Sequence, residues 1–243
     1  GKAVELRDIV AAEGADTVIC DGELAPSQRR ALEDVVKVKV IDRTALILDI
    51  FAQHAKSREG KAQVELAQLN YLVPRLRGWG GSLSRQAGGR AAGDAGIGSR
   101  GPGETKIEMD RRVIRSRIAK LRRQIAQMAP ARDVKRGARR RFGLPTVAVV
   151  GYTNAGKSSL TNRLTGSAEL VENALFATLD TTTRKVYIEG AGQIVVSDTV
   201  GFVRELPHQL VAAFRATLEE TIHADVLFHV VDAASNVRLD QID

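Results

Sequence analysis

The chain has 243 residues, of which 44% are hydrophobic, and its 36 Lys and Arg against 29 Asp and Glu give a net charge of +7. This composition is ordinary for a globular protein of one to three compact units and excludes wholesale disorder. No apolar stretch approaches the roughly 18 residues that a membrane-spanning helix needs. The first ten residues are charged and lack an apolar core, so we expect no signal peptide.

Cysteine and histidine usage narrows the class of protein further. Cys20 is the only cysteine, which excludes an internal disulfide and a zinc site built from several cysteines. We therefore expect a reducing, cytoplasmic location. The four histidines lack the spacing of a metal site and are expected to be structural.

The positive charge is concentrated in the middle of the chain. Residues 75–141 contain 19 basic and 5 acidic residues, whereas the segments on either side are mildly acidic. Such a block predicts contact with nucleic acid. The alternatives are a solvated basic helix face and an acidic protein partner; a membrane surface is less favoured because the segment has few aromatic residues.

The first 42 residues predict an α/β subdomain with parallel strands, incomplete at its start. Apolar residues recur with helical spacing before Gly14, and a second helical pattern opens at Pro26. Short apolar runs follow each of them and predict strands. The predicted order is a helix over residues 4–14, a strand over 17–20, a helix over 26–36 and a strand over 38–41.

Residues 43–131 predict a long antiparallel helical hairpin. One helix is expected over 43–77 and the other over about 104–128, because apolar residues recur mostly three or four positions apart. The seam residues, which we expect in the core, are Leu66, Leu69, Val73 and Leu76 on the first helix and Ile107, Ile114, Ile118, Leu121, Ile125 and Met128 on the second.

The loop that joins the two helices, residues 78–103, has 10 glycines in 26 residues. A loop of this length in a compact domain is usually functional or disordered. Glycine allows close approach of the backbone to a ligand, and arginine suits phosphate. The sequence therefore predicts an RNA-contacting tip, with a flexible linker as the alternative. The candidate RNA contacts are Arg85, Gln86, Arg90, Ser99, Arg100 and Lys106.

A basic linker is expected over residues 132–144, and residues 145–243 predict a second domain built around a phosphate site. A short apolar strand, 146–150, leads into a G-x-x-x-x-G-K-S sequence at 151–158, and a helix follows over 159–164. In this context the backbone N–H groups cradle phosphate, Lys157 reaches the β- and γ-phosphates, and Ser158 binds Mg²⁺. The cradle comprises Gly151, Tyr152, Thr153, Asn154, Ala155, Gly156, Lys157, Ser158 and Ser159.

A second motif typical of nucleotide switches, D-x-x-G, follows about 40 residues later. A strand over 193–197 ends in Asp198, Thr199, Val200 and Gly201. Asp198 would hold Mg²⁺ through water, and the Gly201 N–H would meet the γ-phosphate.

Between these two motifs lies a candidate switch loop: Phe176, Ala177, Thr178, Leu179 and Asp180. A threonine in such a loop can complete the Mg²⁺ shell when the γ-phosphate is present. Chemistry alone leaves its identity open, because Thr181–Thr183 follow directly.

The rest of the second domain predicts a strand over 184–189 that forms a hairpin with 193–197, a helix with an apolar face over 210–222, and a buried strand over 226–231. No N-K-x-D sequence occurs, so guanine specificity does not follow from the residues. We expect the C-terminal part of this domain to be missing.

Three short motifs of the second domain are GYTNAGKSS, FATLD and DTVGF. The first domain adds LILDIFAQHA at 46–55 and the segments 60–76, 83–89 and 98–108. Together they resemble the HflX family of Ras-like P-loop GTPases. The resemblance implies an α/β fold: an N-terminal α/β domain with a long helical hairpin, then a truncated GTPase domain. It also implies Mg²⁺ and GTP, a potassium ion near Asn154, and a monomer. Of the candidate threonines it selects Thr178 as the Mg²⁺ ligand, and it makes Lys157, Thr178 and Gly201 the catalytic residues.

The same resemblance implies a GTP-hydrolysing switch that binds the large ribosomal subunit and its 23S-type rRNA and dissociates stalled or idle ribosomes. Intrinsic turnover should be slow and stimulated by the ribosome, because Phe202 replaces the glutamine that aims the attacking water in Ras-like enzymes. Two alternatives remain: an RNA-binding ribosome-assembly or stress factor whose nucleotide site is only regulatory, and an ATP-driven RNA remodeller.

Overall fold

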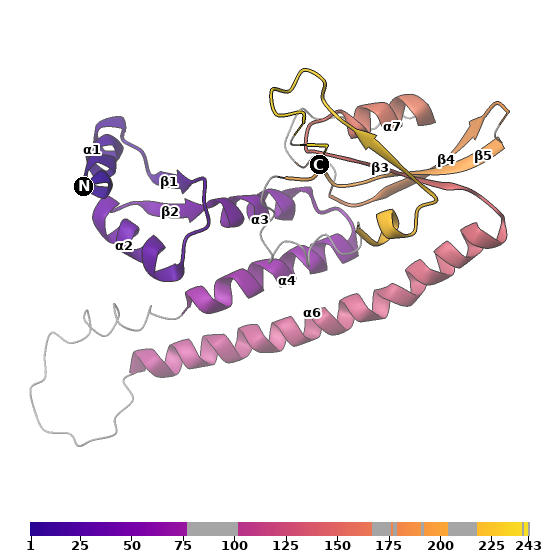
Figure 1. Ribbon diagram of the computed structural model, residues 1–243. Helices are drawn as coiled ribbons and strands as arrows, with labels where there is room; N and C mark the ends of the chain where they lie inside the picture. The colour runs from indigo at the N-terminus through magenta and orange to yellow at the C-terminus, as the bar shows by residue number, and fades with distance from the viewer. Residues whose placement is uncertain are drawn as a thin grey trace, which may run out of the picture. The chain divides into compact units, whose positions relative to one another are not determined.

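The structure is a computed structural model that describes residues 1–76, 102–166, 176, 179–190, 192–203, 218–239 and 241–242 (Figure 1). The side chains of residues 102–107, 135, 136, 139 and 140 are not described. Several predictions lie outside this part of the chain. They concern Ala177 and Thr178, residues 210–217, and the RNA-contact candidates Arg85, Gln86, Arg90, Ser99 and Arg100.

The chain folds into two compact units that do not follow the order of the sequence. One comprises residues 1–48 and 68–122, and the other comprises residues 49–67 and 123–243. Among the described residues, no helix is long and apolar enough to cross a membrane.

The first unit contains the predicted α/β subdomain: α1 (Lys2–Glu13), β1 (Thr17–Cys20), α2 (Pro26–Val36) and β2 (Lys39–Asp42). Helix α1 ends at Gly14, whose φ of 63° is left-handed, and Pro26 occupies the first turn of α2. Strands β1 and β2 pair in parallel, with Thr17 opposite Lys39. The predicted second strand is therefore correct in position but shifted by one residue toward Asp42.

Asp42 holds this subdomain to a helix of the hairpin. Its buried carboxylate accepts hydrogen bonds from the Tyr71 hydroxyl (2.7 Å) and the Arg75 guanidinium (3.1 Å). Burial, reinforced by the bond to Asp42, raises the pKa of Tyr71. Because the buried charges are paired and hydrogen-bonded, the cluster can fix the helix without leaving an uncompensated ion.

The helical segment predicted over 43–77 is two helices, α3 (Arg43–His54) and α4 (Arg58–Arg75), so the prediction of one continuous helix is wrong. The break occurs at 55–57 because Ser57 caps a new helix: its Oγ accepts the Gly60 N–H (2.8 Å).

The second helix of the hairpin, α6 (Pro102–Arg141), is longer than predicted and runs through Pro130, so residues 132–141 are helical and not a linker. The described seam positions are confirmed as its least exposed face, with Leu121 fully buried. Near its end Arg132 pairs with Glu59 at the start of α4, as antiparallel helices require.

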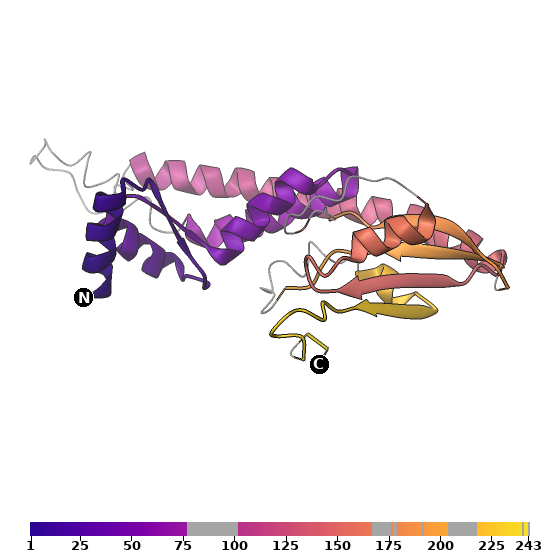
Figure 2. The same ribbon diagram turned by 90° about the horizontal axis from the view of Figure 1, so that it is seen from above.

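The second unit is built on β3 (Thr146–Gly151), α7 (Lys157–Thr165), β4 (Thr182–Ile188), β5 (Gly192–Asp198) and β6 (Val226–Val230). The strand order is β4-β5-β3-β6; β3 pairs in parallel with β5 and β6, and β4 and β5 form the predicted antiparallel hairpin (Figure 2). Its core includes Ala148, Val149, Val195 and Val196.

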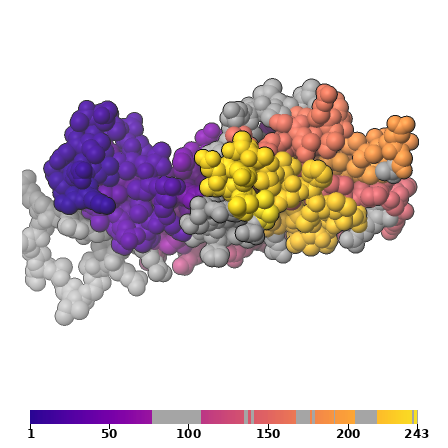
Figure 3. Space-filling view, turned by 45° about the horizontal axis from the view of Figure 1, so that its top comes forward, coloured from indigo at the N-terminus to yellow at the C-terminus, as the bar shows by residue number. Residues whose placement is uncertain are grey.

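The prediction that β6 is buried is wrong in this structure. Val226, Leu227 and Phe228 are 52%, 57% and 49% exposed. Among the described strands it pairs only with β3, at one edge of the sheet, and Figure 3 shows the yellow C-terminal segment that contains it at the surface of the second unit.

Candidate nucleotide site

The phosphate loop joins β3 to α7 and has the backbone that the glycine positions predicted. Gly151 has φ of 145°, and a Cβ there would fall on the carbonyl of Val230 in β6. Gly156, the N-cap of α7, has φ of 91°, and Asn154 is left-handed at 62°. The loop therefore leads into the N-terminus of α7, whose first N–H groups have no acceptor within the helix and can bind phosphate.

Lys157 lies over this loop and is only 6% exposed. Its Nζ donates to the Tyr152 carbonyl oxygen at 2.6 Å. Burial lowers the pKa of Lys157 to about 8, although the Asp198 carboxylate opposes the shift. An ammonium held out of water in this way gains from a nearby anion, so the geometry suits a phosphate.

Ser158 and Asp198 meet at the same end of the sheet. The Ser158 Oγ donates to Asp198 Oδ2 at 2.7 Å, across 40 residues of sequence. They meet because β3 and β5 are parallel neighbours, so the end of β5 lies beside the loop that follows β3. A hydroxyl and a carboxylate are oxygen ligands of the kind that Mg²⁺ takes, and their proximity fits the predicted Mg²⁺ role of both residues.

The segment after β5 is attached to the phosphate loop by backbone bonds. Phe202 donates its N–H to the Gly151 oxygen (3.0 Å) and accepts the Thr153 N–H (2.9 Å). A Cβ on Gly201 would lie 2.6 Å from the Thr153 Cα, so glycine is required there by packing. Thr199 donates its hydroxyl to the Val149 oxygen at 2.6 Å and anchors the same segment to β3.

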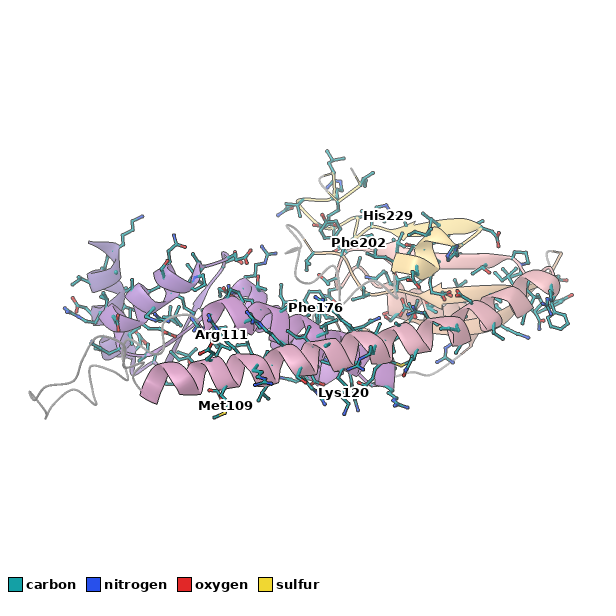
Figure 4. The ribbon with its side chains drawn as sticks, turned by 90° about the horizontal axis from the view of Figure 1, so that it is seen from below. Met109, Arg111, Lys120, Phe176, Phe202 and His229 are labelled. Carbon is teal, nitrogen blue, oxygen red and sulfur yellow. The ribbon has the colours of Figure 1, made fainter. Side chains whose placement is uncertain are left out.

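The described residues of the candidate switch loop are Phe176, Leu179 and Asp180. Phe176 is 4% exposed and packs edge-on against Phe51 of α3, with ring centroids 4.8 Å apart. The Asp180 carboxylate accepts the N–H groups of Lys56 and Ser57 at 2.8 and 2.7 Å. Leu179 is buried. In this structure Phe176, labelled in Figure 4, thus contacts α3, and Asp180 contacts the corner between α3 and α4.

Sequence reasoning missed the role of this corner. One signal was available in the sequence. If Ser57 begins a helix, the third helical position is Gly60, where a capping box would have glutamate or glutamine, so the second half of the cap must come from elsewhere. Of the RNA-contact candidates, only the backbone of Lys106 is described, within α6. Farther along this helix, Lys120 is exposed and Met109 is 64% exposed (Figure 4).

Three family models together match nearly the whole chain. They are described as GTP-binding GTPase N-terminal, over residues 1–52, GTP-binding GTPase Middle Region, over 54–139, and 50S ribosome-binding GTPase, over 146–243. Proteins named GTPase HflX from Caldanaerobacter subterraneus and Escherichia coli are 52% and 51% identical to it over 97% and 99% of its length. The chain belongs to the HflX family.

This HflX-family chain spans about half the length of those relatives, 53% and 55% respectively. It is also similar to a crystal structure described as a complex of SsGBP and GDP, with a TM-score of 0.52 and 28% identity. That match covers 97% of this chain and 60% of the solved one. The family and the fold, as predicted from the motifs, are therefore confirmed.

Proposed function

We propose that the protein is a GTP-hydrolysing switch that docks on the large ribosomal subunit and dissociates stalled or idle ribosomes. The observation that carries the proposal is the convergence of Lys157, Ser158 and Asp198 at the N-terminus of α7 in an HflX-family chain. A basic side chain, a hydroxyl and a carboxylate at a glycine loop form a site for a metal-bound polyphosphate.

In this proposal the cradle residues 151–159 bind the phosphates, and Lys157 neutralises the β- and γ-phosphates. Ser158 and Thr178 bind Mg²⁺ directly, and Asp198 binds it through water. Mg²⁺ supplies charge neutralisation of the phosphate oxygens. Asn154, left-handed and exposed in the loop, is the proposed neighbour of a potassium ion. In this proposal the base of the nucleotide is guanine, because the relatives are named GTPases.

Hydrolysis by the protein alone should be slow. The side chain of Phe202 has no atom that can hydrogen-bond to water, and both of its backbone polar groups are already bonded to the phosphate loop. A residue that orients the attacking water must therefore come from elsewhere, and the ribosome is the proposed source.

The proposed ribosomal partner is supported by charge as well as by family. The family that matches residues 146–243 is described as 50S ribosome-binding GTPase, and residues 75–141 supply 19 basic side chains for rRNA contact. A cytoplasmic monomer is the form that we expect to act.

The test is sedimentation of the full-length protein with purified ribosomes, with a non-hydrolysable GTP analogue or GDP. We expect the protein to migrate with the large subunit, and intact ribosomes to be lost, only with the analogue. Equal binding in both nucleotide states with intact ribosomes would favour the RNA-binding factor with a regulatory nucleotide site. If ATP displaces the bound nucleotide more strongly than GTP does, the result would favour the ATP-driven remodeller.

A further inference from the structure

The first turn of helix α4 receives its cap from a distant part of the chain. In a capping box, the Ser side chain bonds the N–H three residues later, and a glutamate at that third position bonds the Ser N–H in return. Ser57 makes the first bond, to the Gly60 N–H. Gly60 has no side chain to make the second, and Asp180 makes it instead, 123 residues away in sequence.

The glycine and the aspartate fit each other. A Cβ placed on Gly60 would fall on the Asp180 Oδ1, so the third position of α4 must be glycine for the carboxylate to enter. The same carboxylate accepts the Lys56 N–H and the Ser57 hydroxyl. A negative charge at this place also opposes the positive end of the helix dipole.

Asp180 is also connected, through strand β4, to the two candidate Mg²⁺ residues Ser158 and Asp198. Thr182, two residues later, begins β4 and lies directly opposite Asp198 at the end of β5. Asp198 in turn bonds Ser158. A change at the Ser158–Asp198 pair therefore reaches Asp180 through one strand pairing and two residues of chain.

We propose that Asp180 is a positioning residue that couples metal–nucleotide occupancy at Ser158 and Asp198 to the order of the first turn of α4. The inference rests on the proposed function of the site as a nucleotide switch. Ser158 and Asp198 would hold the metal of a bound triphosphate, and their hydrogen bonding, now a direct bond of 2.7 Å, would change with occupancy. In the proposal this change shifts the start of β4, which lies opposite Asp198, and loosens the cap that Asp180 supplies.

The coupling is reciprocal, because a ligand shifts a conformational equilibrium only through its different affinity for the two states. If the triphosphate loosens the cap, then removing the cap favours the triphosphate. We therefore expect Asp180→Asn to raise the affinity for a non-hydrolysable GTP analogue relative to GDP by about 5- to 10-fold, at the lower end of the usual range of such couplings.

The experiment is hydrogen exchange of the backbone amides of residues 56–61 in the full-length protein, with no ligand, with Mg²⁺ and GDP, and with Mg²⁺ and the analogue. Nucleotide binding is measured in parallel by fluorescence. In the unsubstituted chain we expect the analogue to accelerate exchange at least threefold. In Asp180→Asn we expect exchange that is already fast without ligand and does not change further.

Asp225→Asn is the matched control. Asp225 also accepts a backbone N–H within the second unit, that of Thr146 at 2.7 Å, but at the opposite end of β3 from the phosphate loop. It should leave both the exchange of 56–61 and the ratio of nucleotide affinities unchanged. Gly60→Ala displaces the carboxylate from the helix side and should reproduce the effect of Asp180→Asn if that variant folds poorly.

The outcomes separate the two proposals. A chain that binds no guanine nucleotide contradicts the proposed function. A chain that binds the analogue to saturation with unchanged or slower exchange at 56–61 overturns the coupling and leaves the switch intact. An equal change in Asp225→Asn would also overturn it, because the effect would then be general loosening of the unit.

Discussion

At the scale of single residues, the most informative group is the Lys157 ammonium. The motif predicted its place in the phosphate loop, and the structure adds that it is buried and donates to the loop's own Tyr152 carbonyl. A ligand phosphate would replace that carbonyl as its partner. The buried positive charge of Lys157 is thus only partly compensated until an anion binds.

Binding of a nucleotide should therefore be accompanied by proton uptake. Without ligand, the Lys157 pKa is about 8, so most of the amine is neutral at pH 9, whereas a phosphate contact favours the charged form and raises the pKa. We expect most of one proton to be taken up per nucleotide at pH 9 and far less at pH 6.5. Calorimetry in two buffers of different ionisation enthalpy measures this number directly.

Lys157→Met is the control for that experiment. It should abolish the proton uptake together with most of the binding. Because the buried charge is removed, the variant should also be more stable without ligand by about 1–3 kcal/mol at pH 7. The gain should shrink as the pH rises from 8 toward 10.5, where the lysine of the unsubstituted chain becomes neutral in both folded and unfolded states. Uptake that persists in the variant would assign the proton to another group.

The sequence was sufficient to place Lys157, Ser158 and Asp198, because a loop of fixed length on two parallel strands leaves few alternatives. It was not sufficient for Phe176 and Asp180. Their partners, Phe51 and the corner at 56–57, are more than 120 residues away, and nothing local in F-A-T-L-D distinguishes a nucleotide contact from a helix cap.

At the scale of elements, the α3–α4 corner and the end of α6 form one junction. Arg132 of α6 pairs with Glu59 of α4 and, at 3.2 Å, with Glu219 in the helical turn before β6. Burial raises the pKa of Glu59, and Arg132 counteracts part of that rise. The two carboxylates share one guanidinium, so its loss leaves two like charges half-buried together.

Replacing Arg132 with Met should destabilise the second unit in a pH-dependent way. Without the guanidinium the Glu59 pKa would rise further. The folded state would therefore lose most stability at a pH where the Glu59 carboxylate is charged. We expect a loss of about 1–3 kcal/mol at pH 7 and a smaller loss at pH 5, where Glu59 takes up a proton more readily. Urea unfolding at the two pH values measures the difference. Glu59→Gln in the same background should restore much of the loss at pH 7, and an equal loss at both pH values would contradict this account.

Helix boundaries were also the least predictable property at this scale. The periodic pattern of 43–77 is continuous, and only the capping of Ser57 by its tertiary partners divides it. Conversely, the dense basic residues from 132 onward predicted a linker, yet α6 runs through Pro130 to Arg141. In the first case tertiary contacts override the local pattern.

At the scale of the whole molecule, β6 lies at one edge of its sheet, and side chains on both of its faces are exposed. Consecutive residues of a strand point to opposite sides, and Leu227 and Phe228 are each about half exposed. An apolar edge of this kind promotes pairing with other chains.

We expect this chain to self-associate through β6 at high concentration. Serine at both positions 227 and 228 should lower the association measured by sedimentation velocity at about 100 µM, with little change in thermal stability. Tyr187→Ser, on the opposite edge strand β4 and 75% exposed, is the matched control and should have no effect. Equal association of all three proteins would show that β6 is not the contact.

The division of the chain into units has a consequence for exchanging parts between relatives. Residues 49–67 fold with the four-stranded sheet of the second unit, although they precede it by about 80 residues and lie within helices shared with the other unit. A chimera joined at residue 145 would combine Asp180 from one species with the Ser57 and Gly60 of another. Only donors that match at both places should give a functional hybrid, so these two segments should be exchanged together.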